Sequence, residues 1–133
     1  MEMKINDQQL RQVLENLLAN AVEAFDEHPG DISVSLRCVP AAAISFAHRW
    51  PADFQAGASD YACVQVTDGG DGMAPEDLES LFEPFYSTKF TGRGLGLAVA
   101  LGIVKGHDGC ITVETAPGRG SAFRVFLPVL DED

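Results

Sequence analysis

Two asparagines near the start of the chain, Asn16 and Asn20, stand one helical turn apart, and Glu23 follows three residues later. If residues 7–27 form a helix, the three side chains share one polar stripe. An amide oxygen is a hard, neutral ligand that suits Mg²⁺, and an amide can also contact phosphate or water. Since asparagine is a mediocre helix former, the stripe is a candidate metal and phosphate site. An ordinary solvent-facing stripe is the simpler interpretation of these residues alone.

A second candidate is the turn Asp68-Gly69-Gly70-Asp71-Gly72-Met73, which directly follows a strand expected over 61–67. Glycine permits positive φ angles and lets a ligand approach the backbone closely. A carboxylate at a strand end can accept hydrogen bonds from an exocyclic amine, such as that of adenine, and from a bridging water. The acids lack the spacing of a calcium-binding EF-hand loop. The segment is therefore either a purine-binding turn or a common reverse turn.

A third candidate, Gly92-Arg93-Gly94-Leu95-Gly96-Leu97, leads into an apolar helix expected over 94–105. The free N–H groups and positive dipole end of a helix N-terminus favour phosphate. The context excludes a P-loop, a dinucleotide-binding turn and a protein-kinase loop. Residues 84–107 contain no Asp or Glu but hold three of the nine basic residues, including Lys89 and Arg93. This stretch indicates an anion pocket under a flexible lid, with a solvated loop as the alternative.

The hydrophobic periodicity predicts the elements that must position these residues. Helices are expected over 7–27, 75–81 and 94–105, and strands over 32–37, 61–67, 110–114 and 121–127. Their order predicts an α/β fold, a two-layer sandwich in which helices cover one face of a mixed sheet. Residues 40–60 show no clean period and are expected to form a long connection between two strands.

The composition limits the class of protein. The net charge of −11 speaks against nucleic acid or an anionic membrane as a partner. No apolar run is long enough for a membrane span, and the first residues do not resemble a signal peptide, so a soluble, cytoplasmic domain is expected. Three widely separated cysteines form neither a zinc motif nor a disulfide framework. The length fits a single domain over residues 1–133.

Taken together, five segments in this order closely resemble the conserved boxes of histidine-kinase catalytic domains. These domains belong to the superfamily with the Bergerat (GHKL) ATP-binding fold, which also contains type II topoisomerase ATPases, ninety-kilodalton heat-shock chaperones and mismatch-repair ATPases. The resemblance covers roughly residues 5–128. The matching segments are ENLLANAVEAF, VTDGGDGM, FEPFYSTKF, GRGLGLAVALGIVKGHDG and GRGSAFRVFLP.

The resemblance implies a site for ATP and Mg²⁺. Asn20 matches the family's metal-binding asparagine, and Asp68 matches the carboxylate that binds the adenine amine. Asn16, Lys89 and Arg93 match positions expected to act in catalysis. The cofactor contacts implied by the matching motifs are Asn16, Asn20, Glu23, Ala24, Asp68, Gly70, Gly72, Met73, Phe85, Lys89, Gly92, Arg93, Gly94, Leu95, Gly96, Leu97 and Ser121.

The implied reaction is transfer of the γ-phosphoryl group of MgATP to a histidine. At the position of Asn16 the ATP-hydrolysing relatives carry a glutamate that activates water, and an amide cannot accept that proton. No segment resembles the phosphoacceptor box, so the histidine is expected on a separate dimerisation domain, with a response regulator downstream. Glu23 stands where many members have a basic residue, and the lid between Phe85 and Gly94 is short. The alternative function is a nucleotide-binding regulatory module of the degenerate or anti-sigma type.

Overall fold

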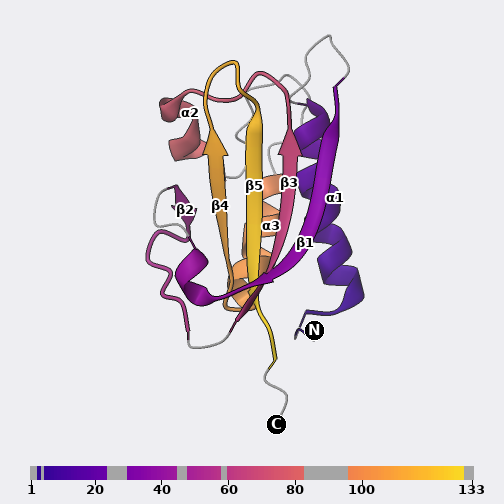
Figure 1. The fold of residues 1–133 in the computed structure, drawn as a ribbon, viewed down its shortest axis with the longest axis vertical. Coiled ribbons are helices and arrows are strands. Elements are labelled where there is room, and N and C mark those ends of the chain that lie inside the picture. Colours follow the sequence, from indigo (N-terminus) through magenta and orange to yellow (C-terminus); the bar gives the residue numbers. More distant parts are fainter. Residues whose placement is uncertain are drawn as a thin grey trace.

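The computed structural model describes residues 3, 5–23, 30–44, 48–57, 60–82 and 96–130. Figure 1 shows its helices and strands along the chain. In chain order they are α1 (Asp7–Glu23), β1 (Ile32–Val39), the short 3-10 helix η1 (Ala41–Ala43), β2 (Arg49–Trp50), β3 (Tyr61–Asp68), α2 (Pro75–Ser80), α3 (Gly96–Gly106), β4 (Cys110–Thr115) and β5 (Ser121–Pro128).

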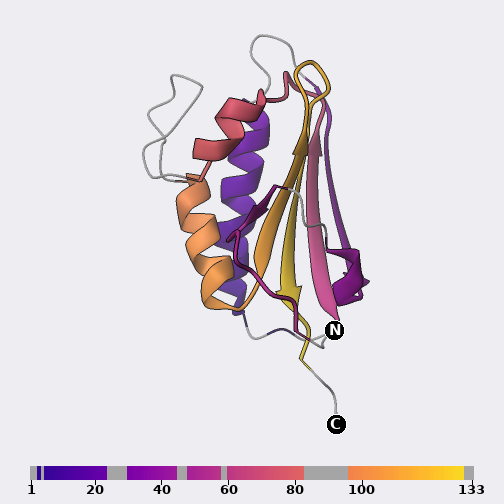
Figure 2. The same ribbon diagram turned by 90° about the vertical axis from the view of Figure 1, so that its left-hand side faces the viewer.

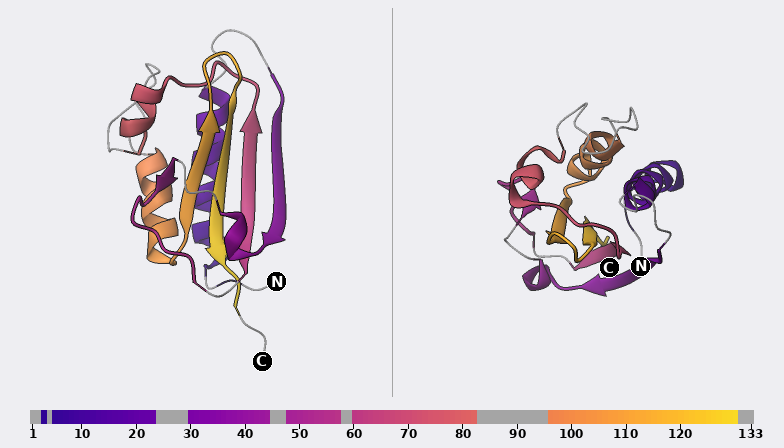
Figure 3. Two further views of the ribbon diagram at one scale, coloured as in Figure 1. Left: turned by 60° about the vertical axis from the view of Figure 1, so that its left-hand side comes forward. Right: turned by 90° about the horizontal axis from the view of Figure 1, so that it is seen from above.

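The strands form one sheet in the order β1-β3-β5-β4-β2, and α1 and α3 lie side by side over one of its faces (Figure 2; Figure 3, right). The predicted α/β two-layer sandwich with helices on one face is therefore confirmed. The four strand pairings are all antiparallel, and the order of the strands in the sheet differs from their order along the chain. None of the described helices is long and apolar enough to cross a membrane.

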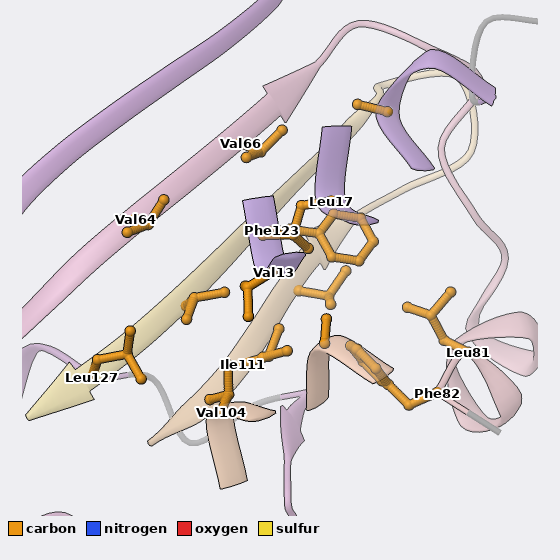
Figure 4. Packing of buried hydrophobic residues seen from close by; sticks show 14 of the residues in the cluster. Val13, Leu17, Val64, Val66, Leu81, Phe82, Val104, Ile111, Phe123 and Leu127 are labelled. Carbon is orange, nitrogen blue, oxygen red and sulfur yellow. The ribbon is translucent and has the colours of Figure 1, made fainter. Parts of the chain in front are cut away.

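The main core fills the space between this helical layer and the sheet (Figure 4). Asn6 caps the start of α1, because its side-chain oxygen accepts a hydrogen bond from the Gln9 backbone N–H at 2.8 Å. Its predicted apolar face buries Val13, Leu17 and Ala21, each only 1% exposed. Facing them are alternate residues of the three central strands, as the period of a half-buried strand requires. These are Val64, Val66, Ile111, Val113, Phe123, Val125 and Leu127.

On the helix-covered face, the apolar side chains of the three central strands give way to polar side chains at one end of the sheet. In the sheet register Ser121 lies opposite both Asp68 of β3 and Thr115 of β4. Each of these three residues stands two positions from a core residue of its own strand, so all three project from the helix-covered face. Here β3 and β4 end and β5 begins, and this end of the sheet positions the candidate site described below (Figure 1).

The connection over residues 40–60 builds a second, smaller core on the opposite face of the sheet. It contributes η1, and β2 pairs with β4 at the sheet edge far from β1. The buried residues of this cluster are Ile44, Tyr61, Cys63, Cys110 and Phe126. The connection is therefore a cover for the outer face of the sheet, which its irregular sequence did not indicate.

Candidate functional site

Asp68, the last residue of β3, is a buried carboxylate whose two oxygens differ in their hydrogen bonding. The side chain belongs to a residue only 4% exposed, and its Oδ1 accepts a hydrogen bond from the Gly70 N–H at 2.9 Å. Its Oδ2 is buried and has no hydrogen-bond partner among the described residues. Burial raises the pKa of Asp68, while the N–H groups of Gly70 and Ser121 act in the opposite direction. Since an unsatisfied buried acceptor costs about 1–3 kcal/mol, Oδ2 is suited to a ligand that brings a donor.

The glycine-rich turn after Asp68 is pressed against the hairpin between β4 and β5. Gly72 has a φ of +70°, and a Cβ at this position would overlap the carbonyl oxygen of Ala116. Gly120, with a φ of +73°, makes an equally close approach to the backbone of Asp68. Both positions require glycine because of positive φ and of close backbone contact. The two turns therefore hold each other in place beside the carboxylate.

A hydroxyl pair joins the same two turns. Thr115 Oγ1 accepts a hydrogen bond from the Met73 N–H at 3.0 Å, donates to the Gly120 carbonyl at 2.9 Å, and lies 2.8 Å from Ser121 Oγ. Sequence reasoning selected Met73 and Ser121 but missed Thr115. The available signal was its place in the strand: it continues the inward alternation of Ile111 and Val113 with a polar residue.

The asparagine stripe of α1 faces its neighbouring helix. Asn16 is half-buried; its Oδ1 accepts a hydrogen bond from Gln12 Nε2 at 3.2 Å, and its buried Nδ2 has no partner among the described residues. A Cβ added to Gly96, the first residue of α3, would lie 3.7 Å from Asn16 Oδ1. Asn20, one turn further along α1, is also half-buried. A fully solvated stripe is therefore not what the structure shows.

Some of the remaining predicted site residues are described by the structure, and others lie outside the described ranges. Leu97 of α3 is half-buried and packs against the main core, and Gly70 supplies the N–H that holds Asp68. Glu23 ends α1, but its side chain is not described. The predicted residues that lie outside the described ranges are Ala24, Phe85, Lys89, Gly92, Arg93, Gly94 and Leu95. For these the predicted contacts stay predictions.

The structure thus arranges the described candidates in two sets. The first set surrounds the end of β3 and contains the Asp68 carboxylate, the glycine turn, Met73 and Ser121. The second lies where the C-terminal half of α1 meets the first turn of α3 (Figure 2). Phe82, two residues after the end of α2, is buried and packs on Trp50 of β2 with ring centroids 4.8 Å apart. A carboxylate acceptor, amides and a glycine-flanked helix start are groups that can bind a purine and phosphates.

An antiparallel sandwich with a carboxylate and a glycine turn at the strand ends, and an asparagine pair on a covering helix, defines an ATP-binding domain of the Bergerat type. The model of the family described as histidine kinase-, DNA gyrase B-, and HSP90-like ATPase matches residues 5–131, and the chain belongs to this family.

Among its relatives are sensor histidine kinases. The chain is 38% identical to the sensor histidine kinase ZraS of Salmonella typhimurium over 121 residues, which is 91% of this chain and 22% of ZraS. It is 36% identical to sporulation kinase C of Bacillus subtilis, over 93% of this chain and 24% of that kinase. It is also 38% identical to the sensor kinase CckA of Brucella abortus, over 94% of this chain and 13% of CckA. The chain therefore spans only about a quarter or less of the length of these relatives.

Two solved structures share the fold. The mycobacterial sensor histidine kinase MprB superposes with a TM-score of 0.67 at 26% identity, over 93% of this chain and 72% of MprB. Full-length ShkA, in a crystal structure with AMPPNP, also has a TM-score of 0.67 at 26% identity, over 98% of this chain and 23% of ShkA. These similarities show that the fold of this chain is one also found in a sensor histidine kinase.

Proposed function

We propose that this chain binds MgATP and transfers its γ-phosphoryl group to a histidine on a separate dimerisation domain. The observation that carries the proposal is Asp68, a buried carboxylate at a strand end with one oxygen anchored to Gly70 and the other without a partner in the described chain. The anchored oxygen fixes the side chain, so the second oxygen is presented in one direction. An exocyclic amine of adenine supplies the missing donor.

The groups around Asp68 suit the rest of the base. Gly70 and Gly72 keep the turn free of side chains beside the carboxylate, and Met73 is half-buried and can pack on an aromatic ring. The related ShkA was crystallised with AMPPNP, a nucleotide whose base is adenine. We therefore assign the base to the place beside Asp68, Met73 and Ser121.

The asparagines of α1 suit the phosphates and their metal ion. Mg²⁺ binds oxygen ligands and usually reaches a protein through one or two side chains together with substrate phosphates and water. Among the described residues there is no cluster of three acids, histidines or cysteines, so a fully protein-made metal cage is not present there. A single amide such as Asn20 fits the ion as its protein ligand, and the ion would neutralise charge on the phosphates. The N–H groups at the start of α3 add positive potential.

Transfer to another group is favoured over hydrolysis because of Asn16. Its amide contacts Gln12 and lies beside Gly96, but an amide is not a base and cannot remove a proton from water. Phosphoryl transfer then depends on positioning and charge neutralisation, for which we propose Lys89 and Arg93 in addition to Asn16. We further propose that residues 1–133 act as one domain, that the acceptor histidine is part of a longer protein or another chain, and that a response regulator receives the phosphoryl group.

Two measurements test this function in sequence. Calorimetric titration with ADP and Mg²⁺ should show binding to the wild-type protein and much weaker binding in Asp68→Asn. Incubation with a histidine-containing dimerisation domain from a sensor kinase and γ-labelled ATP should then transfer label to that domain. Binding without transfer to any cognate domain would favour the regulatory module, and steady phosphate release by the isolated protein would favour a hydrolase. Absence of nucleotide binding would refute the proposal as a whole.

A further inference from the structure

Thr115 forms the centre of a hydrogen-bond junction and lies outside the five segments that carry the family resemblance. It is the last residue of β4, and its hydroxyl contacts three groups: the Met73 N–H at 3.0 Å, the Gly120 carbonyl at 2.9 Å and Ser121 Oγ at 2.8 Å. One hydroxyl thus connects the residue that packs near the base with the hairpin that follows. A hydroxyl has one proton to donate and two lone pairs with which to accept.

The proton positions follow from counting donors. A carbonyl oxygen can only accept, so the single proton of Thr115 points to Gly120. The backbone N–H of Met73 can only donate, and it occupies one lone pair of Thr115 Oγ1. The remaining lone pair of Thr115 therefore accepts the proton of Ser121. All three positions of the Thr115 hydroxyl are then occupied, and Ser121 has only lone pairs to offer on its other sides.

The orientation of Ser121 matters because of what lies opposite it. Ser121 and Asp68 face each other on adjacent antiparallel strands, and both are nearly buried, at 6% and 4% exposed. Directly opposed side chains in such a pair have Cβ atoms about 4.5–5.5 Å apart. Asp68 Oδ2 is an acceptor without a partner in the described chain, so this place in the sheet presents two acceptors and no side-chain donor.

We propose that Thr115 is a positioning residue for base selection: it holds the Ser121 proton away from the base, so that Ser121 and Asp68 together accept from an exocyclic amine and repel a carbonyl oxygen. This inference rests on the proposed nucleotide binding at Asp68. It identifies adenine, whose 6-position carries an amine, as favoured over hypoxanthine, whose 6-position carries a carbonyl. Without the Thr115 hydroxyl, Ser121 is free to donate to Asp68 Oδ2 and so to occupy the acceptor that the amine needs.

The test compares ADP with inosine diphosphate, which differs at the 6-position of the base. Both are titrated with Mg²⁺ into the whole chain as wild type, Thr115→Val, Thr115→Ser and Thr115→Cys. Valine matches the shape of threonine without the hydroxyl, serine retains the hydroxyl, and a thiol is a weak donor and acceptor. We expect the preference for ADP to fall about 3- to 10-fold in Thr115→Val, which corresponds to the loss of one net hydrogen bond. Serine should retain the preference, and cysteine should give an intermediate value.

A double-mutant cycle separates this role from simple support of the hairpin. Ser121→Ala should also reduce the preference for ADP, and adding Thr115→Val to it should change the ratio no further, because Thr115 acts through Ser121. The inference is overturned if Thr115→Val binds ADP and inosine diphosphate more weakly by the same factor, so that the ratio of the two affinities is unchanged. If valine prevents folding, an unchanged ratio in Thr115→Cys overturns it in the same way. Failure of the wild-type protein to bind ADP is the separate outcome that refutes the proposed function.

Discussion

Asp68→Asn changes one atom of the candidate site and reverses its hydrogen-bonding character. The Gly70 N–H donates to Asp68 Oδ1 at 2.9 Å, so the amide of the variant must turn its oxygen toward this N–H. Its NH₂ group then takes the position of Oδ2, which is the acceptor without a partner in the described chain. A donor consequently faces the amine of the base, where the wild-type protein offers an acceptor.

The expected loss of affinity follows from the charge of the group removed. A hydrogen bond to a charged group contributes about 1.5–3 kcal/mol, which corresponds to roughly a 10- to 150-fold change in dissociation constant. Because two donors now oppose each other, we expect the upper part of this range. Calorimetric titration with ADP and Mg²⁺ measures it, with Asp71→Asn as the matched control at an exposed acid of the same turn. An Asp68→Asn affinity within about twofold of wild type would refute the assignment of the base to this carboxylate.

The same variant has a predicted effect on stability that depends on pH. Burial raises the pKa of Asp68 above its ordinary value of 3.8. The folded protein therefore holds this proton more tightly than the unfolded chain does. The corresponding stability is fully present below pH 3.8 and is lost as pH rises through the raised pKa.

Asparagine has no such proton to lose. The free energy of unfolding of the wild-type protein should thus fall relative to that of Asp68→Asn as pH rises from below 3.8, and then level off. Urea denaturation of both proteins at several pH values measures this difference in the absence of nucleotide. If the free energy of unfolding of the wild-type protein instead rises relative to that of Asp68→Asn over the same pH range, burial is not the main influence on the pKa of Asp68.

Four further variants test the fold and the phosphate end of the site. Leu17→Ala removes a core side chain only 1% exposed and should lower the free energy of unfolding by about 2–5 kcal/mol in urea denaturation. Gly72→Ala should destabilise by more than about 1 kcal/mol because of its positive φ and backbone overlap, whereas Gly102→Ala, with open space in α3, should stabilise slightly. Asn20→Ala should abolish the gain in ADP affinity that Mg²⁺ provides while retaining metal-free binding, as paired titrations with and without the ion would show.

The parts of the fold that the sequence predicted are those governed by local period. The residues of α1 repeat at helical spacing and those of β3, β4 and β5 alternate, so each element shows which of its faces is apolar. β1 was predicted in the same way, yet its Val34 and Leu36 are 53% and 60% exposed. They face the same side of the sheet as the core, but at an edge strand, and alternation alone does not reveal where a sheet ends.

The parts that the sequence did not predict depend on contacts between distant segments. Strand β2 contains only two residues, and it pairs with β4 more than sixty positions away along the chain. The segment that covers the outer face shows no hydrophobic periodicity, because single residues such as Ile44 pack against the sheet without forming a regular helix or strand face. The hydrogen bonds of Thr115 could not be predicted for the same reason, because its partners Met73 and Ser121 lie beside it only in the folded chain.

A buried polar atom without a partner does not by itself mark a site, and the described part of this chain shows the distinction. Thr112 Oγ1 on the outer face is buried and unpartnered, as are Asp68 Oδ2 and Asn16 Nδ2. Each such atom costs about 1–3 kcal/mol, against a total stability of about 5–15 kcal/mol for a typical domain. Asp68 and Asn16 differ from Thr112 in their setting, because each lies beside a glycine at the end of an element. Under the proposed function, a nucleotide that supplies the missing partners recovers this cost at Asp68 and Asn16.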